Sequence, residues 1–199
     1  IHCHSQYVRP RVADDLLYWG PSDPIDRVLA ESPPLLGARR LGPDLSHVGN
    51  RRTAEWNRLH LIAPRAISPG SRMPSYAHLF APGDERGPAL VEYLASLGAG
   101  TIPERQAQMS AWVPTSRTSV GDAEAGRIFA KLCSPCHGVE GRGDGVMAAR
   151  LSLGPANWST SPWRHVPAGV DVELVLARII KFGLPGLPMA GHEYLPDPE

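Results

Sequence analysis

The feature that most constrains this chain is the run Cys133-Ser134-Pro135-Cys136-His137, in which two thiols stand three positions apart and an imidazole follows directly. This Cys-x-x-Cys-His spacing is the pattern of covalent haem c attachment. The two thiols can reach the two vinyl groups on one edge of a porphyrin, and the following imidazole then lies under the iron. A thioredoxin-like dithiol is disfavoured because no alternation of strands and helices surrounds the motif, and a zinc site because no second ligand pair has suitable spacing. The motif predicts a haem c attached at Cys133 and Cys136, with His137 as an iron ligand.

The third cysteine lies at the start of the chain, in Ile1-His2-Cys3-His4. A cysteine directly before Ile1 would complete a second attachment motif. A free or buried thiol is the more common fate of a lone cysteine. The rest of the first half nevertheless supplies the other parts of a haem pocket. We therefore expect the sequence to begin inside a second motif, with Cys3 attached to a haem and His4 as its iron ligand.

A c-type electron carrier usually closes its iron with a methionine thioether, a soft ligand that favours Fe(II). Met73 and Met189 lie in segments bounded by proline and glycine, which cannot be helix interiors and suit a stretch of chain that crosses a haem face. We interpret Met147 as a packing residue, and Met109 lies between the two halves. Ligation by two imidazoles stays open as an alternative. The histidines that could compete as axial ligands are His60, His78, His165 and His192.

Few runs of alternating β-branched residues occur, so we expect an all-α fold of short helices wrapped around covalently bound haem. The 21 prolines and 20 glycines imply many turns and a thin core of side chains, which another group would have to fill. The predicted helices and their signals are Ala54–Ile62 capped by Thr53, a helix from Pro88 through Leu97 stopped by Gly98, Ala123–Leu132 capped by Asp122, and Val172–Phe182 capped by Asp171 and ended by Gly183.

The 199 residues suit one large domain or two small ones, and the repeated plan favours two. We expect a first domain over 1–98, a polar linker over 99–118 and a second domain over 119–199. The first domain lacks the helix that should precede its attachment motif, and the second stops before a closing helix. Both ends therefore look clipped.

The charge balance excludes some functions. Lys+Arg and Asp+Glu both total 20, which argues against a nucleic-acid partner because such proteins show a basic field. The longest apolar stretches, such as 170–180, are short and carry charges, so we expect no membrane span within the chain. An anchor outside it stays possible.

The second half resembles a class I cytochrome c domain over about eighty residues. Cys133, Cys136 and His137 match its attachment site, and Met189 matches its distal ligand. The resemblance implies that Pro155, in Gly154-Pro155, directs its carbonyl at the proximal imidazole.

The first half is similar to the mono-haem subunit of cbb3-type cytochrome c oxidases over about a hundred residues. The matching segments are 3–10, 42–45, 48–51 and 73–76. The resemblance implies His4 and Met73 as axial ligands and Pro43 as the carbonyl partner of His4. It also implies propionate contacts from Arg51, Arg52 or Trp56. That family carries one haem and an N-terminal membrane helix, whereas this chain has a second cytochrome domain fused on.

These observations predict a dihaem cytochrome c that relays single electrons to or from a membrane respiratory complex, foremost a haem-copper oxidase of the cbb3 type. With both axial positions filled, we expect no turnover by this chain alone. The alternatives are the cytochrome subunit of a periplasmic dehydrogenase and a dihaem peroxidase-like enzyme. The resemblance implies a location on the periplasmic side of the cytoplasmic membrane, with redox proteins as partners.

Overall fold

The computed structural model describes residues 2–11, 19, 21–22, 24–37, 41–115, 120–160 and 163–195. Ile1, the last residues of the expected linker (116–118) and the chain end at 196–199 lie outside the described residues. The described part is helical and contains no strand, and its isolated β-bridge joins Gly183 to Ala190. The expected all-α class is confirmed.

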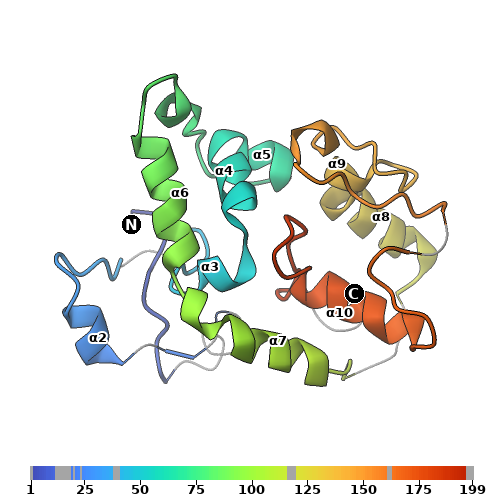
Figure 1. Cartoon of the computed structure of the whole chain (residues 1–199), viewed down its shortest axis with the longest axis horizontal. Coiled ribbons are helices and arrows are strands. Elements are labelled where there is room, and N and C mark those ends of the chain that lie inside the picture. The colour runs from blue at the N-terminus through green and yellow to red at the C-terminus, as the bar shows by residue number, and fades with distance from the viewer. Residues whose placement is uncertain are drawn as a thin grey trace.

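The α-helices of the described part follow one another as α2 (Ile25–Leu29), α3 (Val48–Arg51), α4 (Ala54–Ile62), α5 (Pro64–Ile67), α6 (Arg86–Ser96), α7 (Ile102–Ala111), α8 (Asp122–Leu132), α9 (Ser134–His137) and α10 (Val172–Phe182). Short 3-10 turns lie at Ala77–Phe80, Ala99–Thr101 and Ala148–Arg150. In Figure 1, α3, α4, α5 and α6 gather in the first half and α8 and α9 in the second, while α7 extends toward α10. None of the helices in the described ranges is long and apolar enough to span a bilayer.

Local capping signals place the ends of two helices. The Thr53 hydroxyl accepts a hydrogen bond from the Trp56 amide at 3.2 Å and starts α4. The Asp171 carboxylate accepts from the Leu174 amide at 3.1 Å and starts α10, so both predicted caps are confirmed. The predicted cap of α8 is wrong, because Asp122 is the first helical residue and Gly121 holds the cap position without a side-chain bond.

The core of the first half lies between α4 and α6. Leu61 of α4 packs with Val91 and Leu94 of α6, and partly buried side chains, Met73 among them, close around this cluster. The helix predicted from Pro88 begins two residues earlier, at Arg86, and Gly98 follows it with a φ of 74°. The first half therefore has a side-chain core that holds its own helices together.

The second half buries fewer apolar side chains. Met147 is 2% exposed, which confirms its interpretation as a packing residue, and Ile179 and Phe182 of α10 are also buried. Phe129 of α8 lies against Trp158, with ring centroids 5.5 Å apart. In the described part of the whole chain nine hydrophobic residues are buried, so side chains alone provide a thin core.

The segment expected to be a linker contains helix α7, with Pro103 in its first turn. Arg105 of α7 donates to the Phe182 carbonyl at 3.0 Å, and its guanidinium lies over the Phe182 ring. Trp112 meets the same ring edge-on, and its carbonyl accepts from Arg178 Nε at 2.9 Å. Through these contacts α7 is docked against α10.

Candidate haem-binding sites

His4 is held by the loop at residues 42–44. Its Nδ1 lies 2.7 Å from the carbonyl oxygen of Pro43. A carbonyl oxygen can only accept, so Nδ1 carries the proton and Nε2 keeps the lone pair that a metal would take. A Cβ on Gly42 would lie 2.7 Å from Nδ1 and 2.9 Å from Nε2 of His4, so glycine lets the backbone approach the ring. The contact that the resemblance implies between His4 and Pro43 is thus present.

Asp44 fixes the rest of the first motif to the same loop. Its carboxylate accepts hydrogen bonds from the Ser5 hydroxyl, the Tyr7 amide at 3.0 Å and the Ser46 amide at 2.8 Å. Burial by itself would raise the pKa of Asp44, but these hydrogen bonds to the ionised form outweigh it and hold the pKa below its usual 3.8. The Gly42 amide also donates to the Cys3 carbonyl at 2.8 Å. The segment that carries Cys3 and His4 is therefore held to one loop at several points.

Aromatic and basic side chains gather in the α3–α4 region, and one of them, His60, lies close enough to His4 to respond to its charge. Trp56 and His60 stack with ring centroids 4.6 Å apart, and the Arg52 guanidinium lies 4.9 Å from the Trp56 centroid. Burial, with the nearby Arg52 and His4, lowers the pKa of His60 to about 4. His60 is therefore neutral at physiological pH, and its Nδ1 is buried without a hydrogen-bond partner. It is one of the histidines that keep the alternative of two imidazole ligands open.

Met73 lies in the same half, in an irregular segment before the turn at Ala77–Phe80. Its side chain is partly buried against the cluster formed by Leu61, Val91 and Leu94. Its amide donates to Ser71 Oγ at 3.2 Å, which fixes the backbone locally. A position outside any helix agrees with the sequence interpretation, and its role as a ligand stays a prediction.

The second motif spans the junction of α8 and α9. Cys133 is the C-cap residue of α8, and Cys136 and His137 lie in α9. Both thiols are free and partly buried, and burial raises the pKa of each. No disulfide joins them. The two thiols are neutral and available for thioether formation.

His137 lies in an aromatic setting. Its ring centroid is 4.4 Å from that of Trp158, and its Nδ1 is buried without a hydrogen-bond partner. Burial lowers the pKa of His137, and the nearby backbone of Ala156 acts in the opposite direction. The structure records no hydrogen bond from His137 to the Pro155 carbonyl; that carbonyl instead faces Gly143, where a Cβ would lie 2.6 Å from it. The backbone that acts on His137 is therefore that of Ala156, one residue after the Pro155 that the resemblance implies.

Met189 lies in the tight loop that follows α10. Its carbonyl accepts from the Leu184 amide at 3.1 Å, and Gly183, with a φ of 81°, begins the loop. The side chain is partly buried. His192 follows in the same segment, where burial and the nearby Arg52 lower its pKa to about 4.

The residues at both motifs fit a covalently bound haem c. The first motif offers an imidazole oriented by a carbonyl, and the second offers two free thiols beside a buried ring nitrogen that lacks a partner. Within the described residues no group of three or more His, Cys, Asp or Glu side chains could hold a metal ion. The expected iron ligands, one imidazole and one thioether, are a different donor set.

Sequence reasoning missed two residues that the structure places between the halves. Arg105 of α7 and Glu193 form an ion pair, and Glu193 also lies 3.8 Å from Arg51. Nothing in the local sequence marks either residue. Of the propionate contacts that the resemblance implies, Arg51 and Arg52 lie at this junction and Trp56 lies beside Arg52.

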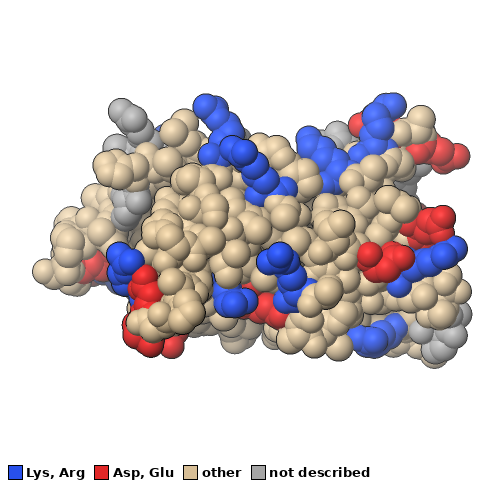
Figure 2. All heavy atoms as spheres, turned by 90° about the horizontal axis from the view of Figure 1, so that it is seen from above, with Lys and Arg blue, Asp and Glu red and all other residues tan. Residues whose placement is uncertain are grey.

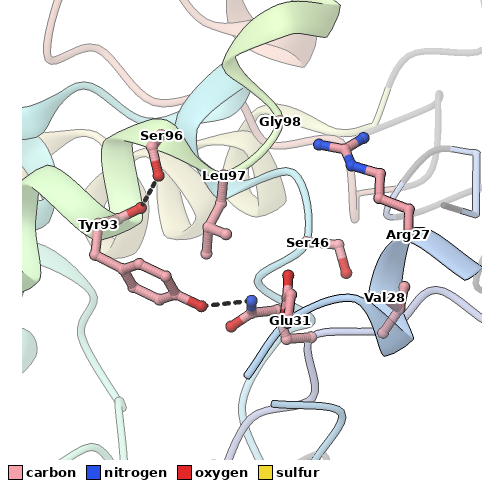
Figure 3. A pocket seen from close by; sticks show the side chains of 9 residues that line it. Arg27, Val28, Glu31, Ser46, Tyr93, Ser96, Leu97 and Gly98 are labelled. Atoms are coloured by element: carbon pink, nitrogen blue, oxygen red, sulfur yellow. Dashed lines mark hydrogen bonds between the residues drawn. The ribbon is translucent and has the colours of Figure 1, made fainter. Parts of the chain in front are cut away.

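A polar cavity of about 230 Å³ is lined by Gln6, two residues after His4, and by residues of the α2 and α6 regions. Figure 3 shows Arg27, Glu31 and Ser46 around it, with Tyr93 close to the side-chain amide of Gln6. No cysteine or histidine lines it. Figure 2 shows basic and acidic side chains interspersed over one face of the molecule, in keeping with the net charge of zero.

Comparison with known protein families supports the resemblance stated for the first half of the chain. Residues 1–86 match the family model described as cytochrome C oxidase, mono-heme subunit/FixO. No curated protein matches the chain. The matched range includes Cys3, His4, Gly42, Pro43 and Met73, which lie in the segments that carry the resemblance. Residues 1–86 of this chain are therefore similar to the mono-haem subunit of cytochrome c oxidase.

Proposed function

We propose that the protein is a dihaem c-type cytochrome that relays single electrons to or from a membrane respiratory complex, foremost a haem-copper oxidase of the cbb3 type. The observation that carries this proposal is the hydrogen bond between His4 Nδ1 and the Pro43 carbonyl. It joins an attachment-type motif to a loop 39 positions away, and both lie within the segment that matches the oxidase subunit family. The second motif, with free thiols at Cys133 and Cys136, supports a second haem.

In this proposal the chain holds each cofactor by thioether links and two axial side chains. Cys3 serves the first site, and Cys133 and Cys136 serve the second. When bound, haem c supplies an iron that alternates between the ferrous and ferric states and so carries one electron. The proposed axial pairs are His4 with Met73 and His137 with Met189.

The work of the protein residues is to orient and to exclude water. The Pro43 carbonyl fixes the tautomer and rotation of His4, and Asp44 keeps the segment that bears it in place. Trp158 covers one side of His137. Because both axial positions would be taken by side chains, we propose no turnover by this chain alone.

The test is a count of covalently attached haems after expression in the periplasm of a host with a haem c attachment system. Mass spectrometry and a pyridine haemochrome assay should find two haems per chain. Replacing Cys133 and Cys136 together by Ala should leave one, and replacing Cys3 should remove or weaken the other. A single haem in the unaltered chain contradicts the proposal.

The axial ligands are tested by near-infrared absorption of the oxidised protein. Met73→Ala should abolish one of two thioether-to-iron charge-transfer bands, and His60→Ala, in the same half, should leave both. The reverse result would establish ligation by two imidazoles. A reduced haem that binds carbon monoxide in the unaltered protein would favour the peroxidase-like alternative.

The partner is tested by co-purification from the native membrane. Recovery of a copper- and haem-containing catalytic subunit supports the oxidase assignment. Recovery of a dehydrogenase with an organic cofactor would keep electron transfer and change the complex. Labelling of the chain from the periplasmic side of intact cells checks the proposed location.

A further inference from the structure

The loop that carries Met189 begins and ends at a glycine; we call it the Met189 loop (183–191). Gly183 turns the chain out of α10 with a φ of 81°. A Cβ on Gly191 would lie 2.4 Å from the backbone carbonyl carbon of Phe182, so the two ends of the loop lie against each other. These backbone contacts close the base of the loop, and side chains from other elements then reach both of its ends.

Arg105 of α7 contacts both ends of the Met189 loop with one guanidinium. Before the loop, it donates to the Phe182 carbonyl at 3.0 Å and lies 5.5 Å from the centroid of the Phe182 ring. After the loop, it forms an ion pair with Glu193. The side chains of Arg105 and Glu193 are 12% and 16% exposed, so water screens their attraction only weakly. A single side chain from outside the loop therefore joins the residues on its two sides.

The helix that carries Arg105 is itself anchored beside the loop. The Trp112 ring, just after α7, meets the Phe182 ring edge-on, and the Trp112 carbonyl accepts from Arg178 Nε at 2.9 Å. Arg52, which follows α3, donates to the Gly191 carbonyl at 3.0 Å. Arg52 and α7 both precede residue 119, where the second half is expected to begin. A loop of the second half is thus held in part by the earlier part of the chain.

We propose that Arg105 is a positioning residue for Met189: by joining Phe182 to Glu193 it keeps the Met189 loop closed and the thioether in place at the second site. This inference rests on the proposed dihaem function, in which Met189 is an axial ligand. A ligand on a loop is available only in the fraction of molecules whose loop is in position, so a contact that holds the loop raises that fraction. Ligation at the second site then depends on a helix outside the second half.

The experiment is a titration of the purified oxidised holoprotein with imidazole, which competes with a thioether for the iron. The readout is the loss of the near-infrared thioether-to-iron band, and the Met73→Ala and Met189→Ala backgrounds assign each band to one haem. Arg105→Gln removes the charged contacts at both ends of the loop, so the affinity of the second haem for imidazole should rise about tenfold. The first haem should not change.

Two further variants test whether the effect belongs to this contact. Arg105→Lys keeps a charge that can pair with Glu193 but loses the planar fork, so it should restore part of the difference. Arg127→Gln is the matched control, because Arg127 also lies in an ion pair, with Glu124 in the second half, but its side chain is 70% exposed. This control should leave imidazole binding unchanged at both haems.

Glu193→Gln gives a second reading if Arg105→Gln does not fold. It removes the contact at one end while Arg105 keeps Phe182, so the affinity should rise in the same direction by a smaller factor. An unchanged affinity in the variants that fold, or an equal rise at both haems, would overturn the positioning role of Arg105. A single haem in the unaltered protein, or no thioether band in Met73→Ala, would instead overturn the proposed function. The haemochrome count and the near-infrared spectrum of the same samples separate the two failures.

Discussion

Gly42, Pro43 and Asp44 show how much one short segment can do when each of its residues contacts a different part of a motif. The Gly42 amide donates to the Cys3 carbonyl, the Pro43 carbonyl accepts from His4, and the Asp44 carboxylate accepts from the Ser5 hydroxyl and the Tyr7 amide. None of these contacts uses an apolar side chain. The position of His4 therefore depends on the close backbone approach at Gly42 and on the charge of Asp44. A single substitution at either residue should displace the imidazole.

Gly42→Ala should displace the His4 ring. The added Cβ would lie within 2.9 Å of the imidazole, where no real contact of that kind persists. We expect a loss of about 1–3 kcal/mol of folding free energy from overpacking, measured by urea unfolding. We also expect an altered low-spin absorption spectrum of the holoprotein. Gly100→Ala is the control, because a Cβ there meets open space. Equal behaviour of the two variants would show that His4 is not held by this loop.

In the Asp44→Asn variant, the free energy of unfolding should change less between neutral and acid pH than it does in the unaltered protein. The folded-state pKa of Asp44 lies below 3.8, because hydrogen bonds to the ionised form outweigh the opposing effect of burial. Its carboxylate therefore stabilises the fold fully above 3.8, and this contribution is lost as the pH falls through the lower, folded-state value. We expect Asp44→Asn to cost about 1–3 kcal/mol at neutral pH and less in acid, by urea unfolding at both conditions. An unchanged difference in acid, or an effect as small as that of exposed Asp26→Asn, would contradict this account.

At the scale of elements, α10 begins at the side-chain cap of Asp171. This cap can be removed without changing the buried residues of the helix. Asp171→Ala removes the acceptor of the Leu174 amide and should cost about 1 kcal/mol in unfolding free energy. Asp171→Ser should recover most of that loss because its hydroxyl can accept the same bond. Asp122→Ala of α8 is the comparison, since Asp122 makes no cap bond and should cost less. If Asp171 and Asp122 cost the same, charge at the helix end and not the cap is responsible.

The elements that could be predicted from the sequence are those whose ends are marked locally. α4 and α10 have the predicted bounds because a capping residue and a breaker flank an apolar stripe. Helix α7 was missed because its segment is polar, and its contacts with Phe182 come from residues some eighty positions away. The same limit applies to the sites. The motifs are local patterns, whereas the pairing of Arg105 with Glu193 joins positions 88 apart and has no local signal.

At the scale of the whole molecule, contacts of several kinds tie the halves together. Glu55 of α4 accepts from both the amide and the hydroxyl of Ser152, at 2.6 and 2.8 Å. Arg52 reaches the Gly191 carbonyl, and α7 lies against α10. The expected division into domains at 98 and 119 stays a prediction. These contacts nevertheless mean that the two halves should not unfold independently.

A double-mutant cycle on Arg105 and Glu193 measures how strongly this ion pair stabilises the contact between the two halves of the chain. Each side chain is largely buried, so we expect Arg105→Gln and Glu193→Gln to show a coupling energy of about 0.5–3 kcal/mol in urea unfolding. The control is the exposed pair Arg142 and Glu140, whose side chains are 61% and 62% exposed; water screens this pair, so its coupling energy should be smaller. Removing this ion pair should also split a single thermal unfolding transition into two. A coupling no larger than that of the exposed pair, together with one unbroken transition in both single variants, would mean that other contacts, such as that between Glu55 and Ser152, hold the halves together.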